Sequence, residues 1–484
     1  MRLRSFLLLA TLSALALAGT RAAERPRSGG TLRVELGASV MSLDPAVRAA
    51  SPSEADGKSD LAGLVFESLV RLDTTGAPQP VLVDHYDKDS TSRHWTFHLL
   101  AGVHFHDGAA LTPDVAAAAL ANPDPSWTVS NSADSVIIET RDPTPDLPYL
   151  LAESRHALVH RGPDGSLAGT GPFKLTTWEA GKHVVFAANE DYREGRPFLE
   201  GVDVALGVAS RERMIALQLA KADLVDLPPA LVRRATDDKL RTTVTVPVDL
   251  VAVVFELGGE AGERLNRAPA QDPRVRQAIA HTIDREAIAS FILQKQGDAT
   301  GALLPQWLSG TAFLFSTAYD PSDARALWAQ IKPAPALVLG YDSGEALDEA
   351  IAERIAVNAR EAGIAITSRA ISSANRSGFD ARLVRLRLAS PEPRVALTDA
   401  LENFTPLSSA SLSGTVAEPP ANPATAEEVF ESERAALEGY RVVPIVYMPR
   451  IYGVGNRVRN WQIRASEALS GWQLADVWIE GEGP

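Results

Sequence analysis

The sequence predicts an α/β fold with more than one domain, and three observations lead to this prediction. Segments with helical spacing alternate with strand-like segments in both halves of the chain, an order typical of α/β proteins. With 484 residues, the chain is long enough for two or three domains. Its 45% hydrophobic and 22% charged residues are ordinary for a globular protein that buries a core.

Strands are predicted where short apolar runs, or alternating apolar and polar residues, lie between turn residues. The segment 31–36 alternates in this way, and 251–257 is a compact apolar run. In chain order, the predicted strands are 31–36, 95–99, 103–106, 136–138, 173–175, 184–186, 251–257, 336–340, 364–366, 382–388 and 442–447.

Helices are predicted from capping residues and from apolar residues that share one side. Thr112 and Pro113 begin an alanine-rich helix, with threonine as the cap and proline at the first helical position. Asp272 and Pro273 begin another helix in the same way, and Asp284 caps the helix that follows. The remaining helices are predicted near 61–70, 205–222, 347–362 and 427–437.

The N-terminus has the pattern of a secretory signal peptide. Arg2 and Arg4 precede an apolar run at 6–18, and small residues suited to cleavage follow it. A membrane-spanning helix needs about 20 apolar residues, so this run is short for one, and an uncleaved anchor is the alternative. Thr20 stands where a lipoprotein signal would have its lipidated cysteine, so we expect no lipid anchor. We therefore expect removal of residues 1–23 and a mature protein that is free in the periplasm.

Composition excludes several classes of function. Lys and Arg number 47 against 61 Asp and Glu, and the resulting net charge of −14 argues against a nucleic-acid partner, because phosphates are bound by surplus positive charge. The chain has no cysteine, which excludes disulfides, thiolate metal sites and a cysteine nucleophile.

No motif indicates catalysis or a bound cofactor. The chain has neither a G-x-S-x-G nor an H-E-x-x-H sequence, and Gly57-Lys58-Ser59 lacks the first glycine of a phosphate-binding loop, because Pro52 occupies that position. Histidines gather at positions 85, 94, 98, 104 and 106. His104 and His106 lie two apart on a predicted strand and could chelate a metal, but the turn that follows explains them structurally. We expect no catalytic residues, no metal and no cofactor.

Ten short segments follow one another along residues 29–295, and together, in this order, they form a specific sequence pattern. They are Gly29–Val34, Leu43–Pro45, Phe66–Leu72, Trp95–Leu99, Gly102–Gly108, Leu111–Thr112, Gly169–Leu175, Asn189–Tyr192, Asp272–Ile279 and Ile283–Arg285. In this order the chain resembles the peptide/nickel-type extracellular solute-binding proteins of family 5, the substrate-binding proteins of ABC transporters. The part after residue 295 matches more loosely, through its helix and strand pattern.

The resemblance implies a periplasmic-binding-protein-like two-lobe fold (type II, cluster C) with a small inserted subdomain. Lobe I would comprise 29–55, 169–250 and 455–484, the inserted subdomain 56–168, and lobe II 255–450. A ligand would favour the closed state, because only that state offers contacts from both lobes.

The chain departs from the family pattern in two places. The inserted subdomain is short after Leu120. Many relatives have a tryptophan- and aspartate-rich segment that helps to recognise a peptide terminus, whereas the corresponding stretch here, 385–393, lacks that acidic group and contains Arg385 and Arg387. The arginines indicate a ligand with a carboxylate or another anion, and the alternative is that they face solvent on a strand.

Six residues are the candidate ligand-binding residues: Ser51, Ser53, Glu256, Trp307, Arg385 and Arg387. The two serines lie in a loop that touches ligand in relatives. Glu256, at the end of a predicted strand, could pair with Arg387 across the cleft or bind a ligand amine. Trp307 lies in a loop bounded by proline and glycine, which favours ligand stacking, although burial in the core is the alternative.

The sequence thus predicts a non-catalytic, monomeric periplasmic protein that captures a peptide or a similar small polar solute and passes it to an ABC permease in the inner membrane. Two alternatives stay open. The first is a degenerate family member that serves as an interaction module in the envelope, which the short subdomain and the missing acidic segment favour. The second is a hydrolase, for which no sequence signature supplies a nucleophile and a base.

Overall fold

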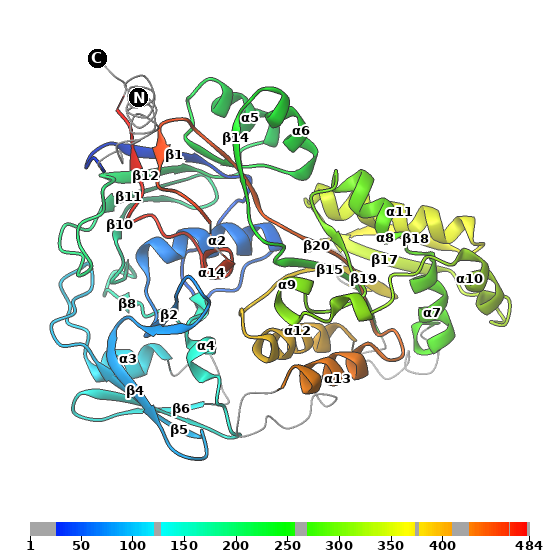
Figure 1. Cartoon of the computed structure of the whole chain (residues 1–484), viewed down its shortest axis with the longest axis horizontal. Helices are drawn as coiled ribbons and strands as arrows, with labels where there is room; N and C mark the ends of the chain where they lie inside the picture. The colour runs from blue at the N-terminus through cyan, green and yellow to red at the C-terminus, as the bar shows by residue number, and fades with distance from the viewer. Residues whose placement is uncertain are drawn as a thin grey trace, which may run out of the picture.

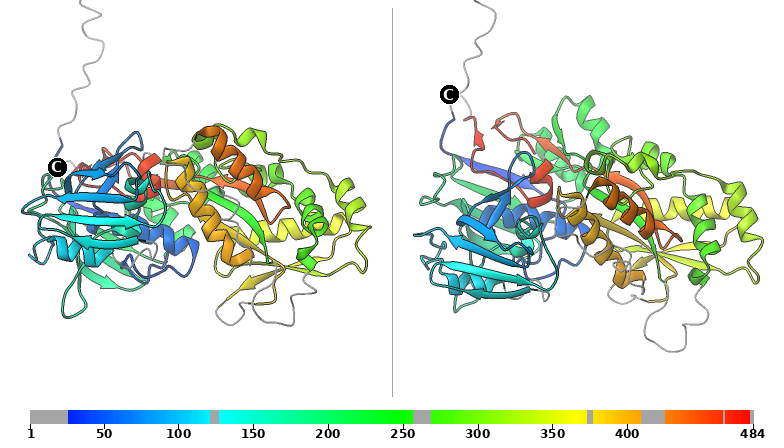
Figure 2. Two further views of the ribbon diagram at one scale, coloured as in Figure 1. Left: turned by 90° about the horizontal axis from the view of Figure 1, so that it is seen from below. Right: turned by 60° about the horizontal axis from the view of Figure 1, so that its bottom comes forward.

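The computed structural model describes residues 26–120, 127–256, 269–372, 377–408, 425–463 and 465–481. Figure 1 and the two views of Figure 2 agree that these residues form two bodies side by side, so the predicted two-lobe α/β fold is confirmed. The predicted signal peptide, 1–23, lies outside the described residues. Among the residues that are described, no helix is both long enough and apolar enough to span a membrane.

A seven-stranded sheet forms the centre of lobe I. In spatial order its strands are β10 (Phe173–Glu179), β11 (His183–Ala188), β12 (Gly201–Ala205), β1 (Thr31–Glu35), β13 (Leu224–Asp226), β21 (Ile451–Val454) and β14 (Arg241–Val244). Leu32 and Val34 of β1 are buried and their neighbours are not, as the two-residue period predicts. The lobe also contains α5 (Ser210–Gln218), α6 (Pro229–Asp237), α14 (Ala465–Ser470), β22 (Val458–Arg459) and β23 (Trp478–Ile479).

Helix α2 (Pro52–Val65) packs against this sheet. Leu61, Leu64 and Val65 are buried in the same hydrophobic cluster as β1 and β12. The helix predicted near 61–70 therefore starts earlier and ends at Val65, because the backbone of the next residue, Phe66, is extended. The expected start of the inserted subdomain, residue 56, falls within this helix, which packs with lobe I because its apolar side faces that sheet.

The inserted subdomain is built on a four-stranded antiparallel sheet. Its strands, in spatial order, are β4 (Val83–Lys88), β5 (His94–Leu99), β7 (Ser135–Thr140) and β6 (Trp127–Asn131). One face buries Trp95, Phe97, Val136 and Ile138. Its other elements are β2 (Val70–Leu72), β3 (Pro78–Pro80), α3 (Pro113–Leu120), α4 (Leu147–Leu151), η1 (Ser154–His156), β8 (His160–Arg161) and β9 (Leu167–Ala168).

The strand predicted at 103–106 is wrong. His104 makes only an isolated bridge with Ala110, and the backbone N–H of Phe105 donates to the carbonyl of Ala109 at 2.8 Å. Gly108, with φ +87°, closes this turn, so the apolar alternation belongs to a tight loop.

Lobe II contains a six-stranded sheet. In spatial order its strands are β16 (Asp298–Ala299), β20 (Val442–Met448), β15 (Asp249–Phe255), β19 (Ala381–Arg387), β17 (Leu337–Asp342) and β18 (Ile366–Ile371). Its helical segments are η2 (Pro269–Gln271), α7 (Pro273–Thr282), α8 (Arg285–Ala287), η3 (Ile288–Ile292), α9 (Gln306–Ser309), η4 (Ala312–Leu314), α10 (Pro321–Trp328), α11 (Ala346–Glu361), α12 (Pro393–Ser408) and α13 (Ala426–Leu437).

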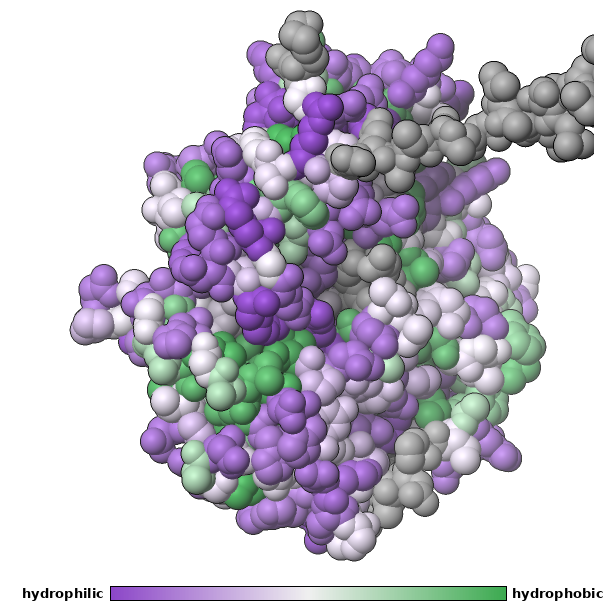
Figure 3. Space-filling view, turned by 60° about the vertical axis from the view of Figure 1, so that its left-hand side comes forward, coloured by the Kyte–Doolittle hydropathy of each residue, from purple (hydrophilic) through white to green (hydrophobic). Residues whose placement is uncertain are grey.

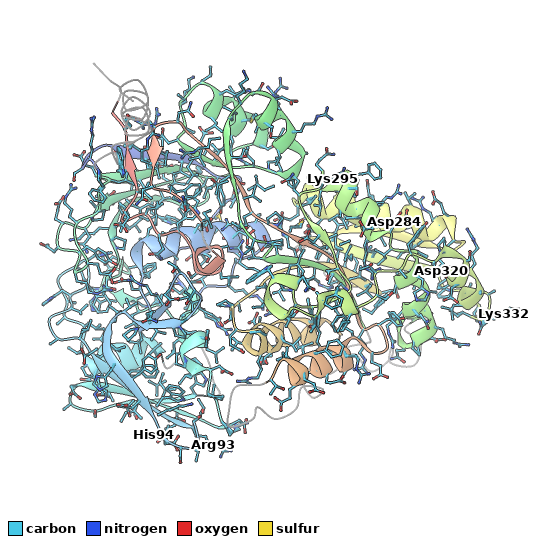
Figure 4. All side chains as sticks on the ribbon, in the orientation of Figure 1. Arg93, His94, Asp284, Lys295, Asp320 and Lys332 are labelled. Atoms are coloured by element: carbon cyan, nitrogen blue, oxygen red, sulfur yellow. The ribbon has the colours of Figure 1, made fainter. Side chains whose placement is uncertain are left out.

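Capping residues start several of these helices, as predicted. Asp272 accepts a hydrogen bond from the backbone N–H of Arg274 at α7, and Asp284 accepts one from Ala287 at α8. Asp320 caps α10 in the same manner; Figure 4 labels Asp284 and Asp320.

The chain passes between the lobes at 245–248, between β14 and β15, and at 449–450, between β20 and β21. The two crossings are hydrogen-bonded to each other: Thr245 N–H donates to the carbonyl of Arg450, and Arg450 N–H donates to Oγ1 of Thr245, both at 2.9 Å. Strand β15 thus joins the lobe II sheet from residue 249, and β21 joins the lobe I sheet from residue 451. These limits differ by a few residues from the expected ends of the lobes, because both strands begin directly after the crossings.

Hydrophilic residues cover most of the face shown in Figure 3. The large clusters of buried hydrophobic residues lie inside the two lobes.

Candidate functional site between the lobes

Strand β19 carries two arginines toward the face between the lobes. Ala381 and Leu383 alternate into the core of lobe II, and Arg385 and Arg387 continue the same face of the strand beyond that core. The side chains of Arg385 and Arg387 are only 12% and 15% exposed. The alternative that these arginines face solvent is therefore wrong.

Arg387 pairs with carboxylates from both lobes. Its Nε donates to Oδ1 of Asp249 at 3.1 Å, because the antiparallel register of β15 and β19 places the two residues opposite each other. Its other partner is Asp56 in the first half of α2, which belongs to lobe I and is 21% exposed. This ion pair joins the lobes.

Glu345, directly before α11, makes a second contact between the lobes. Its Oε2 accepts a hydrogen bond from Nη2 of Arg385 at 2.8 Å, and its Oε1 accepts one from the backbone N–H of Ser53 at 3.2 Å. Ser53 lies in the first turn of α2, where backbone N–H groups have no partner within the helix. Burial would raise the pKa of Glu345, but the charge of Arg385 and the bonds from Ser53 outweigh it and hold the pKa below its usual value.

Carboxylates outnumber arginines on this face. The carboxylates that act on the charges of Arg385 and Arg387, or on one another there, are Asp56, Asp60, Asp249, Asp342, Glu345 and Asp348. Arg450 is a third arginine that acts on Asp56 and Arg387. Asp348 is 1% exposed, and its Oδ1 has no hydrogen-bond partner within the described part of the chain.

The pKa values of two of these carboxylates are raised, chiefly by burial. Burial raises the pKa of Asp348 to about 6; Arg385 opposes the shift, and Glu345 adds to it. Burial likewise raises the pKa of Asp56 to about 6, with Arg387 opposing and Asp249 adding.

A further ion pair ties α2 to the second chain crossing. Asp60, fully buried in α2, receives the guanidinium of Arg450, with Nη1 at 2.5 Å from Oδ1, and the hydroxyl of Tyr452 donates to its Oδ2 at 3.3 Å. The charged face and the crossing are consequently parts of one polar network.

The structure brings three of the six candidate residues together: Ser53, Arg385 and Arg387. Ser51 lies beside them, but its Oγ caps α2 by accepting from the backbone N–H of Glu54 at 3.2 Å. It is a structural residue of the site's helix.

Glu256 and Trp307 lie elsewhere. Glu256 pairs with Arg382, so the expected pair with Arg387 is wrong. Arg387 lies opposite Asp249 at the start of β15, whereas Glu256 follows the other end of this strand, whose seven residues extend about 23 Å. Trp307 is 36% exposed, and its Nε1 donates to the carbonyl of Pro247 in the first chain crossing at 2.7 Å.

Asp56, Asp249, Glu345 and Asp348 were not recognised from the sequence. They come from three separate elements, and no local pattern distinguishes them from surface acids. A weak signal exists for Asp249, an acidic residue at the start of an otherwise apolar strand.

His104 and His106 do not form a metal site together. Nδ1 of His104 contacts the carbonyl of Gly102, and Nε2 of His106 contacts that of Gly171, both at 2.9 Å. Both residues line a hollow of about 600 Å³ next to β10, away from the face between the lobes.

Residues 77–403 match the family described as bacterial extracellular solute-binding proteins, family 5 Middle, which confirms the resemblance seen in the sequence. Oligopeptide-binding protein AppA of Bacillus subtilis is 30% identical over 141 residues, 28% of this chain and 24% of AppA. Heme-binding protein A of Haemophilus influenzae is 23% identical over 300 residues, 52% of this chain and 53% of that protein. These matches span about a quarter to a half of the length of the curated relatives.

Solved structures are similar over nearly the whole chain. The binding protein AgaA of A. tumefaciens R10, in complex with agropinic acid, has a TM-score of 0.79 at 20% identity and covers 94% of this chain and 99% of its own. AppA of Bacillus subtilis, in complex with a nonapeptide, has a TM-score of 0.75 at 16% identity and covers 94% and 100%. At these identities the likeness establishes the fold.

Proposed function

The chain belongs to the bacterial extracellular solute-binding proteins of family 5, and from this membership we propose that it captures a small polar solute, the size of a short peptide, between its lobes for an ABC importer. One relative is named oligopeptide-binding protein AppA and another probable D,D-dipeptide-binding periplasmic protein DdpA, and these names support this class of ligand. In this proposal the protein is exported to the periplasm, has no catalytic activity and docks on a permease of the inner membrane.

The observation that supports the chemistry of the ligand best is the surplus of carboxylates on the face between the lobes. Arg385 and Arg387 already pair with Glu345, Asp249 and Asp56, so little of their positive charge is left for an anion. The ligand that fits this face carries a positively charged group, such as a protonated amine, which would interact favourably with the carboxylate of Asp348, whose Oδ1 has no hydrogen-bond partner within the described part of the chain. This replaces the anionic ligand that the arginines alone indicated.

Ligand-induced thermal stabilisation tests the proposal. Short peptides, free amino acids and polyamines are compared with acidic and neutral sugars, since a ligand at a hundred times its Kd adds about 2.7 kcal/mol to the stability of the folded state. We expect stabilisation by cationic members of the set, and loss of that stabilisation in Asp348→Asn. The matched control is Glu353→Gln, which removes an exposed carboxylate from the same helix, α11.

A second function, an interaction module of the envelope, is favoured by one specific observation. Asp56 forms an ion pair with Arg387, and Glu345 accepts a hydrogen bond from the backbone N–H of Ser53, so contacts within the chain itself hold the two lobes together. If no member of the set, and no solute from a periplasmic extract, stabilises the wild type, this second function is preferred.

A further inference from the structure

We propose that His85, Asp87 and His98 form a binding site for a divalent first-row transition metal ion on the outer face of the inserted subdomain. His85 and Asp87 lie two residues apart on β4, so they share one face of the strand. His98 of β5 lies opposite His85 in the antiparallel register. The opposite face of these strands carries Tyr86 and Phe97, which pack toward the core.

The distances suit a metal ion. Oδ2 of Asp87 lies 3.6 Å from Nε2 of His85 and 3.5 Å from Nε2 of His98, and the three ligand atoms are within 4.8 Å of one another. Ligands at 2.0–2.1 Å around a tetrahedral Zn²⁺ are separated from one another by about 3.3 Å. Small side-chain rotations therefore bring the three atoms to a single ion.

Neighbouring groups hold both imidazoles in the tautomer that a metal needs. Nδ1 of His85 is 3.0 Å from Oδ2 of Asp84, and Nδ1 of His98 is 2.9 Å from Oγ of Ser135, which itself donates to Oδ1 of Asp134 at 2.7 Å. Each neutral imidazole then donates from Nδ1 to its oxygen partner and keeps the lone pair on Nε2.

When both imidazoles are neutral, three acceptor atoms converge: the Nε2 atoms of His85 and His98 and the Oδ2 atom of Asp87. Their lone pairs repel one another unless a cation lies between them. Carboxylate or hydroxyl groups behind the distal nitrogen are also the usual support of histidine ligands. The rings of His85 and His98 stack with centroids 4.2 Å apart, an arrangement that two imidazolium charges would disfavour.

Ser135, His98 and Asp87 also have the order of a Ser-His-Asp relay, the arrangement that the hydrolase alternative would need. Ser135 is only 1% exposed, and its hydroxyl proton is directed to Asp134, so no substrate reaches it and His98 does not activate it. The metal site accounts for the same contacts without a buried nucleophile.

Two imidazoles and one carboxylate favour Zn²⁺, Ni²⁺, Co²⁺ or Cu²⁺ over Mg²⁺ or Ca²⁺, which prefer oxygen ligands. The side chains of His85, Asp87 and His98 are 55%, 72% and 30% exposed, so at least one coordination position is open to water. Such an ion exchanges with solution, and the site is separate from the face between the lobes, so it does not depend on the proposed function.

The test uses the full mature protein without an affinity tag, titrated with Zn²⁺ by calorimetry and with Co²⁺ by visible absorption. We expect the wild type to bind one Zn²⁺, and we expect the Kd of this ion to rise at least tenfold in both His98→Ala and Asp87→Asn. Asp87→Asn changes a side chain that is 72% exposed, so its folding is not at issue. The matched control His94→Ala removes a histidine that lies on the same strand and contacts Glu139 at 3.2 Å, and it should titrate like the wild type.

The wild type should also give the intense visible absorption of Co²⁺ in a site of low symmetry, and both site variants should lose it. The proposal is overturned if the wild type binds no Zn²⁺, or if His98→Ala and Asp87→Asn bind it as the wild type does. A protonated, metal-free ion-pair cluster would give the first of these results.

Discussion

Oε1 of Glu345 in lobe II accepts a hydrogen bond from the backbone N–H of Ser53 in lobe I at 3.2 Å. A carboxylate thus lies at the N-terminus of a helix of the other lobe, where the partial positive charge of α2 favours it. The same carboxylate binds Arg385, so one side chain links the first turn of α2 to the central strands of lobe II. Relative movement of the lobes must break or rebuild this contact.

Glu345→Gln should weaken the contact between the lobes. The neutral amide cannot compensate the charge of buried Arg385, and its bond to Ser53 is weaker, so we expect a loss of about 1–3 kcal/mol in the free energy of unfolding. Chemical denaturation measures the loss, and Glu353→Gln on the same helix is the control. Equal stability of Glu345→Gln and the control would show that the contact contributes nothing.

Asp348→Asn should make the ligand-free protein more stable at neutral pH. The pKa of Asp348 is about 6 in the folded state, above its ordinary value of 3.8, so the folded state binds a proton more tightly than the unfolded state does. Above pH 6 the charged carboxylate therefore costs stability, and this cost disappears as the pH falls from 6 toward 4.

Removal of that charge should raise the free energy of unfolding by about 1–3 kcal/mol at neutral pH, with a much smaller gain at a pH of about 4. Denaturation curves of variant and wild type at the two pH values check this. A gain that does not depend on pH would contradict the charge as its cause.

Arg387→Met should destabilise the protein strongly, because it leaves the carboxylates of Asp56 and Asp249 without their common partner. Breaking a buried ion pair by removal of one partner costs about 3 kcal/mol or more. Adding Asp56→Asn to this variant should restore part of the loss, whereas Arg354→Met, on the exposed side of α11, should change little. Failure of the second substitution to rescue would argue against direct coupling of the two residues.

Trp307→Phe distinguishes a structural role from ligand stacking. The variant keeps an aromatic ring but loses the hydrogen bond to the carbonyl of Pro247, so we expect a loss of about 1 kcal/mol in stability. Ligand affinity, measured by calorimetry with any solute found in the screen, should stay within twofold of the wild type. A tenfold loss of affinity with unchanged stability would instead support the ligand-binding role expected from the sequence.

The fold could be predicted well from the sequence, because its signals are local. Alternation at β1, the caps Asp272 and Asp284, and the ordered family segments each need only a few neighbouring residues to be recognised. The prediction failed at 103–106, where the same alternation belongs to a turn around Gly108. Periodicity cannot separate a strand from a short hairpin-like loop.

The site could be predicted only in part. Arg385 and Arg387 were identified, but their surroundings depend on pairs such as Arg387 with Asp56, which are more than 300 positions apart in the chain. Glu256 was expected to pair with Arg387 across the cleft, but Arg387 lies opposite Asp249 at the start of β15, whereas Glu256 follows the end of that strand, so the length of β15 separates them. The sign of the charge between the lobes follows from such long-range contacts, and no local motif reports it.

The most direct test of capture between the lobes is the distance distribution between spin labels on the two lobes, with and without the solutes extracted from the native compartment. Because the chain has no cysteine, Lys221→Cys in lobe I and Glu353→Cys in lobe II, both exposed, give a uniquely labelled pair. We predict a shift and narrowing of the distribution when solutes are added, and no such change when Asp348→Asn is also present. An identical distribution with and without solutes in the otherwise wild-type chain would contradict the account.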